Sequence, residues 1–318
     1  MLLSVRDLSV RFGAVEPLSD LSFDLDRGEI LGLVGESGSG KSLTAMAVAG
    51  LLPLVAGRIA GGSVCFDGTD LTRLDEAGLR PYRGRRIGFV TQNPMTALDP
   101  AQRVGPQVDV VSRLHMGLSR AEARARTVAL MTDLRIPEAP AICEAYPHHL
   151  SGGMKQRIVI AMALAGEPDL IIADEPTTAL DVTVQAQIIH ILGQMVKDRG
   201  LGLMLITHDM GVVAQICDRV AVLYAGRLAE TGTAAALFAR PRHPYTAALI
   251  GCIPQPGMAP GSLSGIPGAV PSALAYSAGC RFHARCARMR ERCRSVVPAL
   301  APQAEGGAFA CHNPLEAP

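Results

Sequence analysis

A phosphate-loop pattern, G-x-x-x-x-G-K-[ST], is matched without a gap by the residues Gly35-Glu36-Ser37-Gly38-Ser39-Gly40-Lys41-Ser42. The glycines at positions 38 and 40 allow the backbone to wrap around a phosphate, so that successive N–H groups point inward. We expect Lys41 to reach the β- and γ-phosphates of a nucleotide, and the Ser42 hydroxyl to bind Mg²⁺. The alternative is a glycine-rich turn that matches by chance, which the apolar run before the loop and the helical pattern after it disfavour.

Two adjacent carboxylates, Asp174 and Glu175, follow the apolar run 170–173. Such a run predicts a buried strand whose end lies where open α/β sheets bind ligands. Asp174 is then placed to hold Mg²⁺ through water, and Glu175 to orient or deprotonate an attacking water. Alone, an acidic pair after a strand is usually a solvated turn. Its combination with a phosphate loop favours catalysis.

These residues need a scaffold of strands and helices, and the sequence predicts one. Strands are expected at 2–11, 21–25 and 30–34, and a helix from 41 to about 52. Residues 93–150 indicate a helical subdomain with a helix at 120–134. Beyond it, helices at 153–165, 182–199 and 211–216 alternate with strands at 170–173, 203–206 and 220–224. This alternation predicts an α/β fold with a parallel sheet covered on both faces.

The composition excludes several functions. Thirty Lys and Arg against 29 Asp and Glu give a net charge of +1, which offers no overall field for nucleic acid. Aromatic residues make up 4% and Trp is absent, which argues against stacking on sugars or single-stranded bases. The N-terminus lacks the pattern of a secretory signal, and the longest apolar runs, such as 158–166, are too short for a bilayer crossing. We therefore expect a soluble chain whose membrane role passes through a partner.

Further motifs carry a family resemblance. They are Leu150-Ser151-Gly152-Gly153-Met154-Lys155-Gln156-Arg157, Asp181 and Thr207-His208-Asp209. With the phosphate loop, they make residues 1–240 resemble the ATP-binding subunits of ABC transporters. The resemblance implies a P-loop NTPase ABC ATPase domain: a RecA-like parallel sheet core, an antiparallel β subdomain and a helical signature subdomain. A single nucleotide-binding unit is expected, because no internal repeat is found.

The resemblance also implies roles for individual residues. Nucleotide contacts are expected from Phe12, Gln92, Asp174, Asp181 and the loop from Gly35 to Ser42, and contacts to the ATP of a partner subunit from Ser151, Gly152 and Gly153. Mg²⁺ ligands are expected at Ser42, Gln92 and Asp174, and catalytic roles at Lys41, Gln92, Glu175 and His208. Phe12 would stack on adenine. Two ATP molecules would then be enclosed between two subunits arranged head to tail.

The motifs TQNPMTALDP (91–100), YPHHL (146–150) and RHPYT (242–246) resemble the oligopeptide, dipeptide and nickel importer branch. That branch implies an ATP-hydrolysing importer subunit for dipeptides or oligopeptides, with nickel or a small solute such as glutathione as the alternative. It implies a second, related ATPase subunit, two membrane-spanning permease subunits and an extracytoplasmic solute-binding protein, with no nucleic acid. The location implied is peripheral, at the cytoplasmic face of the inner membrane.

Functions outside transport fit the sequence less well. An ABC ATPase of DNA repair needs a long coiled coil between the phosphate loop and the signature, and the roughly 110 residues here leave no room for one. Translation factors of this type carry two cassettes in one chain. A module that has lost catalysis is disfavoured because Lys41, Asp174, Glu175 and His208 are all present.

The last part of the chain, 241–318, is expected to be an appended module and not more sheet. It is rich in Pro, Gly and Ala up to about 276, then basic and rich in cysteine. Its four cysteines are Cys280, Cys286, Cys293 and Cys311, and the six nearby arginines are expected to lower their thiol pKa values. Their spacing alone leaves zinc, a cluster and unrelated thiols open. The resemblance implies a [4Fe-4S] cluster, with Zn²⁺ or free thiols as alternatives and His283 and His312 as substitute ligands or bystanders. If the arginines do not serve a metal centre, they form a solvated basic face or a patch near anionic lipid headgroups.

Overall fold

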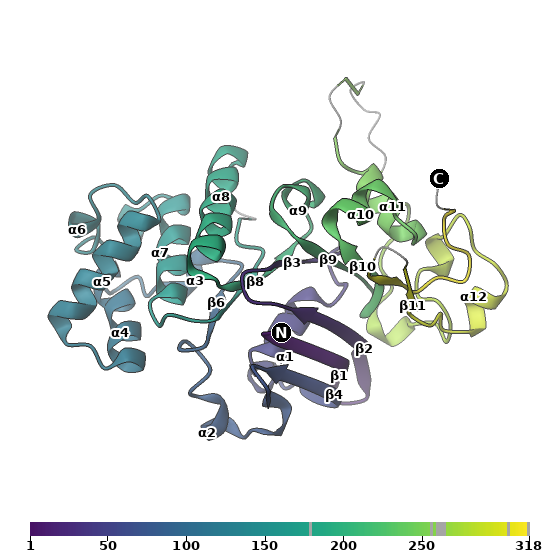
Figure 1. The fold of residues 1–318 in the computed structure, drawn as a ribbon, viewed down its shortest axis with the longest axis horizontal. Helices are drawn as coiled ribbons and strands as arrows, with labels where there is room; N and C mark the ends of the chain where they lie inside the picture. Colours follow the sequence, from purple (N-terminus) through teal and green to yellow (C-terminus); the bar gives the residue numbers. More distant parts are fainter. Residues whose placement is uncertain (178–179, 255–256, 259–264, 304–305, 317–318) are drawn as a thin grey trace.

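Two β-sheets, a group of helices to one side and a C-terminal extension on the other make up the fold (Figure 1). The computed structural model describes residues 1–177, 180–254, 257–258, 265–303 and 306–316. The larger sheet lies between the helices and the extension, so it is the element that holds the candidate site in place.

The larger sheet has eight strands in the order β11-β12-β10-β9-β3-β8-β7-β6. Five strands pair in parallel: β3 (Ile30–Val34), β6 (Ile87–Val90), β7 (Leu170–Asp174), β8 (Gly202–Thr207) and β9 (Arg219–Tyr224). Every residue of β3, β7 and β8 is buried, which explains why these strands are continuous apolar runs without alternation. The predicted parallel core is confirmed.

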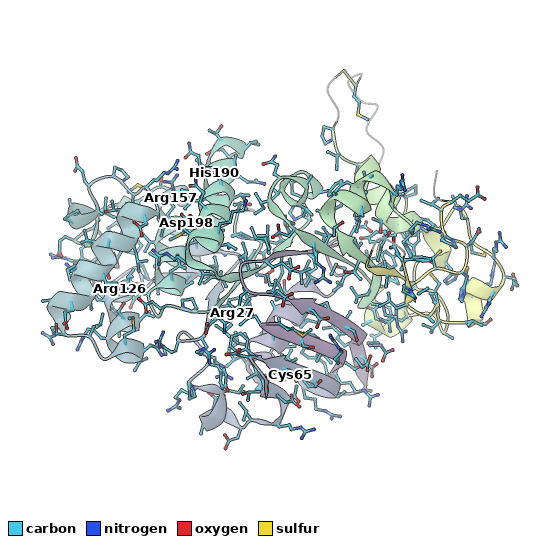
Figure 2. All side chains as sticks on the ribbon, viewed as in Figure 1. Arg27, Cys65, Arg126, Arg157, His190 and Asp198 are labelled. Carbon is cyan, nitrogen blue, oxygen red and sulfur yellow. The ribbon has the colours of Figure 1, made fainter. Side chains whose placement is uncertain are left out.

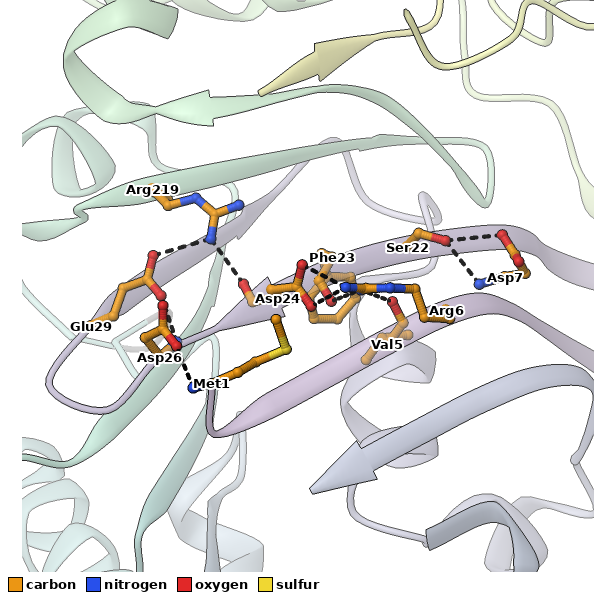
Figure 3. Close-up of polar contacts among 10 residues, drawn as sticks. All are labelled: Met1, Val5, Arg6, Asp7, Ser22, Phe23, Asp24, Asp26, Glu29 and Arg219. Carbon is orange, nitrogen blue, oxygen red and sulfur yellow. Dashed lines mark hydrogen bonds and ion pairs between the residues drawn. The ribbon is translucent and has the colours of Figure 1, made fainter. Parts of the chain in front are cut away.

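The smaller sheet is antiparallel, in the order β2-β1-β4-β5. Its strands are β1 (Leu3–Phe12), β2 (Val15–Leu25), β4 (Arg58–Phe66) and β5 (Thr69–Asp70). It covers one face of the core sheet together with α1 (Lys41–Val48). At one end, Arg219 of β9 donates to the Asp24 carbonyl and lies 3.3 Å from the Glu29 carboxylate, as Figure 3 shows. This guanidinium joins the two sheets where β2 leads into β3.

Two element limits differ from those expected by more than one residue. Strand β2 begins at Val15 and not at Leu21, because it pairs with β1 along nearly its whole length. Helix α1 ends at Val48, four residues early. Gly50 adopts a left-handed conformation (φ 67°) there, and a 3₁₀ turn, η1 (Leu52–Val55), follows.

The helical subdomain is formed by short and medium helices on the far side of β6. They are α3 (Pro94–Ala97), α4 (Val104–Met116), α5 (Arg120–Asp133), α6 (Ala139–Ile142), η3 (Pro147–His149) and α7 (Gly152–Leu164). Two arginines labelled in Figure 2 join them: Arg157 of α7 donates to the Leu134 and Arg135 carbonyls, and Arg126 of α5 donates to the Ala165 carbonyl. Each bond joins α5 or the residues after it to α7 or its end, so the helices hold α7 at a fixed angle to the core.

The remaining helices pack beside the sheets or lie in the extension. They are η2 (Leu71–Arg73), α2 (Glu76–Leu79), α8 (Val182–Arg199), α9 (Met210–Ile216), α10 (Ala234–Ala239), α11 (Pro244–Gly251), η4 (Ala273–Ala275), η5 (His283–Arg285) and α12 (Arg292–Ser295). In the ranges that the structure describes, no helix combines the length and hydropathy needed to cross a bilayer.

The extension continues the core sheet, which corrects the expectation that no strand follows residue 241. Strand β12 (Ala308–Phe309) pairs antiparallel with β10 (Arg227–Thr233), and β11 (Ala301–Pro302) pairs with β12. The hydrogen-bonding edge of β10 is thereby covered. Strands of two residues are too short to show a periodicity, so they could not be predicted from the sequence.

His243, before α11, is fully buried, and this burial lowers its pKa from 6.5 to about 4. Its ring Nδ1 accepts the Tyr245 backbone N–H at 3.0 Å, and the His243 backbone N–H donates to the Glu230 carboxylate at 2.9 Å. The unfolded chain takes up a proton here near pH 6.5 and the folded chain only near pH 4. The stability contributed by the neutral ring is therefore complete above pH 6.5 and is lost as the pH falls towards 4.

We predict that His243 alone lowers the free energy of unfolding by roughly 3 kcal/mol between pH 7 and pH 4. Urea unfolding of the wild type and of His243→Asn at pH 7, 6, 5 and 4 measures this, since the Asn amide can still cap the helix. The variant should show a shallower dependence on pH. Identical slopes in the two proteins would contradict the assignment.

Candidate functional site

The phosphate loop lies between β3 and α1 in a conformation that only glycine permits at two positions. Gly35 has φ 153° and a Cβ there would lie 2.2 Å from the Leu223 carbonyl. Gly40 has φ 104° and a Cβ there would lie 2.3 Å from Leu18 Cδ2. The loop is thus pressed against neighbouring backbone and side chains, and its shape is fixed before any ligand binds.

Lys41 begins α1 and is buried. Its Nζ donates to the Gly35 carbonyl at 2.8 Å and to the Glu36 carbonyl at 3.1 Å. Burial lowers the pKa of Lys41, and the nearby carboxylates of Glu175, Asp174 and Glu36 oppose that shift. A buried ammonium group held by two carbonyls in a glycine loop is a strong attractor for phosphate oxygens.

Strand register brings the second half of the predicted site to the same place. Val34 of β3 is level with Thr207 of β8, and Asp174 of β7 is level with Ile206. The Ser42 hydroxyl consequently donates to Asp174 Oδ1 at 3.1 Å. Burial raises the pKa of Asp174, so a cation between these two oxygens would favour the ionised carboxylate.

Glu175 follows directly and has a left-handed backbone, with φ 45°. Its N–H donates to the Ile206 carbonyl at 2.9 Å. Gln92 Nε2 donates to Glu175 Oε2 at 3.0 Å, and His208 Nδ1 lies 3.3 Å from Oε1. The carboxylate is 14% exposed and the His208 ring 57%, so the acid is partly enclosed and the imidazole faces outward. Three of the predicted catalytic residues therefore lie together, with Gln92 and His208 on either side of the Glu175 carboxylate.

A cavity of about 240 Å³ opens beside the loop. Its lining is Pro17, Ser37, Gly38, Gly40, Lys41, Ser42, Leu43, Gln92 and Glu175. Phe12 is not among these residues. Its ring instead packs beside Gly57, where an added Cβ would lie 2.8 Å from the ring. The contact of Phe12 with adenine stays a prediction.

The donor set fits a magnesium-bound nucleoside triphosphate. Lys41 supplies a cation, the glycines supply a cradle, and the Ser42 and Asp174 oxygens are the hard ligands that Mg²⁺ takes.

The signature residues lie apart from this cavity. Ser151 caps α7 by accepting the Met154 N–H at 3.3 Å, and it is exposed together with Gly152. Gly153 packs so closely on α8 that a Cβ would lie 2.6 Å from Val184 Cγ1. Asp181 caps α8 by accepting the Val184 N–H at 3.0 Å. Nucleotide contacts from these four residues stay predictions.

Two residues outside the predicted set support the loop. Tyr245 of α11 accepts the Glu36 N–H through its hydroxyl at 2.9 Å, and Arg285 of η5 pairs with the Glu36 carboxylate at 2.7 Å. Tyr245 lies in the RHPYT motif, which contributed to the family resemblance but did not indicate a role for this residue. Nothing in the local sequence around Arg285 separates it from the neighbouring arginines.

The structure gives no support to the metal centre expected at the four C-terminal cysteines. Cys280, Cys286, Cys293 and Cys311 are free thiols close enough to affect one another's ionisation. Within the described part of the chain, however, no group of three or more His, Cys, Asp or Glu side chains is arranged to hold a metal ion. The [4Fe-4S] cluster and the Zn²⁺ alternative therefore find no support, and no step is derived through either.

The expected lowering of the thiol pKa values is wrong. Burial raises the pKa of Cys280 to about 11 and also raises those of Cys286 and Cys311. Two arginines of the run direct their charge elsewhere: Arg281 donates to the Ala225 carbonyl, and Arg285 to Glu36. Desolvation of the thiols therefore outweighs the charge of the arginine run.

Fold and site together define a P-loop ATPase of the ABC type. Comparison with known families gives two matches: "ABC transporter" over residues 18–178 and "Oligopeptide/dipeptide transporter, C-terminal region" over residues 229–293. The chain belongs to the ABC transporter family.

Relatives match it along nearly their whole length. An oligopeptide transport ATP-binding protein of Salmonella typhimurium is 46% identical over 99% of this chain and 95% of its own. A dipeptide transport ATP-binding protein of Escherichia coli is 42% identical over 99% of this chain and 97% of its own. Among solved structures, the dimeric post-hydrolysis ATP-binding cassette MJ0796 bound to ADP and Pi has a TM-score of 0.65 at 26% identity, covering 73% of this chain and 99% of that one.

We predict that Gly153→Ala lowers the free energy of unfolding by about 1–3 kcal/mol, because the new methyl group collides with Val184. Gly193→Ala in α8 is the matched control: a Cβ there meets Ile216 only at 3.9 Å, so this variant should gain about 0.5–1 kcal/mol. Urea unfolding of both measures the difference. Equal stability of the two variants would show that α7 and α8 yield freely at their contact.

Proposed function

We propose that this chain is the ATP-hydrolysing subunit of an importer that takes up dipeptides and oligopeptides. The observation that carries the proposal is the meeting of Lys41, Asp174 and Glu175 at one sheet edge. Support for the substrate comes from relatives described as oligopeptide and dipeptide transport ATP-binding proteins, and from the matched C-terminal region.

Each residue of the site has a separate role in hydrolysis. MgATP supplies the phosphoanhydride bond that is broken and the cation that neutralises its oxygens. Lys41 binds phosphate oxygens, while Ser42 and Asp174 hold the cation. Glu175 orients the attacking water and accepts its proton, and Gln92 keeps the carboxylate turned towards the cavity. His208, exposed beside Glu175, donates to the γ-phosphate in this proposal.

A second ATPase subunit completes the site in this proposal. Ser151, Gly152 and Gly153 lie at the N-terminus of α7, outside the cavity of their own chain. An exposed helix N-terminus of this kind binds an anion brought by another molecule. We infer that it closes on the ATP of a related, non-identical subunit, and that Asp181 contributes at that interface. The dimeric structure of the ATP-binding cassette MJ0796 supports the pairing of two ATPase subunits.

The wider assembly follows from the same family branch. Two membrane-spanning permease subunits would dock beside the helical subdomain, with an extracytoplasmic solute-binding protein delivering substrate. The ATPase subunit would then lie peripherally at the cytoplasmic face of the inner membrane. Closure and reopening of the ATPase pair would drive alternating access in the permeases.

We predict that Glu175→Gln binds MgATP with nearly wild-type affinity while its turnover falls by at least about 100-fold, because the amide cannot accept the proton. Lys41→Ala should instead lose nucleotide affinity. Equilibrium binding and steady-state ATPase assays on the assembled transporter separate the two effects. Wild-type turnover in Glu175→Gln would disprove the role given to Glu175.

We also predict that cells carrying Lys41→Ala lose uptake of labelled dipeptides and oligopeptides while nickel uptake is unchanged. Competition among peptides of different length would then define the size range. Loss of nickel uptake alone would replace the peptide assignment with the nickel alternative. No change in either uptake would contradict the transport proposal for these substrates.

A further inference from the structure

An arginine of the C-terminal extension contacts the phosphate loop directly. Arg285 Nη1 donates to Glu36 Oε2 at 2.7 Å, and Nη2 donates to Oε1 at 2.9 Å. Two parallel bonds between a guanidinium and a carboxylate are the strongest form of this pair. The Arg285 side chain is only 6% exposed, so the pair is largely shielded from solvent.

The guanidinium is fixed from its other side as well. Its Nε donates to the Pro267 carbonyl at 2.8 Å, and Nη2 also donates to the Ile266 carbonyl at 3.0 Å. The Tyr224 hydroxyl accepts from Nη1 at 3.3 Å. Arg285 therefore presents a rigid fork to the loop and not a mobile surface charge.

The backbone of Glu36 is held by a second residue of the C-terminal region. The Tyr245 hydroxyl accepts the Glu36 N–H at 2.9 Å. Tyr245 is fully buried, and its ring packs on Tyr224 and Phe282 at centroid distances of 4.6 and 5.3 Å. Both the main chain and the side chain of Glu36 are thus fixed by residues more than 200 positions away.

The position of Glu36 sets the position of the groups that meet phosphate. Its carbonyl accepts Lys41 Nζ at 3.1 Å and the Ser39 N–H at 3.1 Å. Glu36 also places a negative charge in a loop that must receive an anion. A neutralising partner is needed if that charge is not to repel phosphate, and Arg285 supplies it.

We propose that Arg285 is a positioning residue for nucleotide binding, through which the C-terminal extension holds Glu36 and cancels its charge at the phosphate loop. The inference rests on the proposed function of that loop. It gives the extension a role in the ATPase site that does not involve its cysteines.

The test is titration of the full-length chain with a fluorescent ATP analogue in the presence of Mg²⁺. Arg285→Ala should bind about tenfold more weakly than the wild type, within the usual range of coupling between sites. Arg285→Lys keeps the charge without the fork and should fall between them. Arg290→Ala, at an exposed arginine of the same segment, is the matched control and should bind as the wild type does.

A double-mutant cycle separates this role from a general effect on folding. In the Glu36→Gln background no carboxylate is left to repel phosphate, so adding Arg285→Ala should cost less than threefold in affinity. An equal loss in both backgrounds, or unchanged affinity in Arg285→Ala, overturns the inference. If Arg285→Ala does not fold, the same cycle is run with Arg285→Lys, and equal losses again overturn it.

Lys41→Ala, measured in parallel, distinguishes the inference from the function it depends on. A wild-type chain that binds the analogue no better than Lys41→Ala overturns the proposed function and the inference together. Tight wild-type binding that Lys41→Ala abolishes and Arg285→Ala leaves intact overturns only the inference.

Discussion

The site depends on the register of the parallel strands β3, β7 and β8, whose C-terminal ends lie side by side. Because β3 and β7 both pair with β8, Val34, Asp174 and Thr207 end at the same edge within one residue of one another. The phosphate loop, Glu175 and His208 are the next residues along each strand, so they must emerge together. A slip of one residue in any pairing would turn Asp174 away from Ser42. Because every residue of these strands is buried, such a slip would also move each side chain into a part of the core packed for a different one.

The backbone at Glu175 carries strain that the site requires. A non-glycine residue in the left-handed region costs about 1–3 kcal/mol. The turn is nevertheless held, since the Glu175 N–H bonds to the Ile206 carbonyl at 2.9 Å and β7 is locked before it. Glycine would relieve the strain and remove the carboxylate. The sharp turn brings that carboxylate within 3.0 Å of Gln92, which lies after a different strand.

Sequence alone predicts the parts of the site that are continuous along the chain. The loop 35–42 and the pair Asp174–Glu175 each combine a short motif with a strand or helix beside it, and the structure places these elements as expected. Their register against one another follows from the parallel sheet. The sequence cannot predict contacts between residues that are far apart in the chain. Arg285 is one of six arginines in its segment, and only the folded structure shows that it is the one that pairs with Glu36. The prediction of lowered thiol pKa values is wrong for a similar reason, because the burial that raises these pKa values depends on the folded structure.

The extension is bound to the ATPase core by groups that cannot be left unpaired. Glu230 of β10 is 1% exposed, and its carboxylate accepts the N–H groups of Arg242 and His243 as well as the Gln303 amide. Leaving a buried polar group without its hydrogen-bond partners costs about 1–3 kcal/mol, and more for a charged group. Tyr245 and Phe282 also belong to the apolar cluster that contains Val34. Since packing and polar contacts both continue across residue 240, the phosphate loop and the extension share one core, and a change in one is felt by the other.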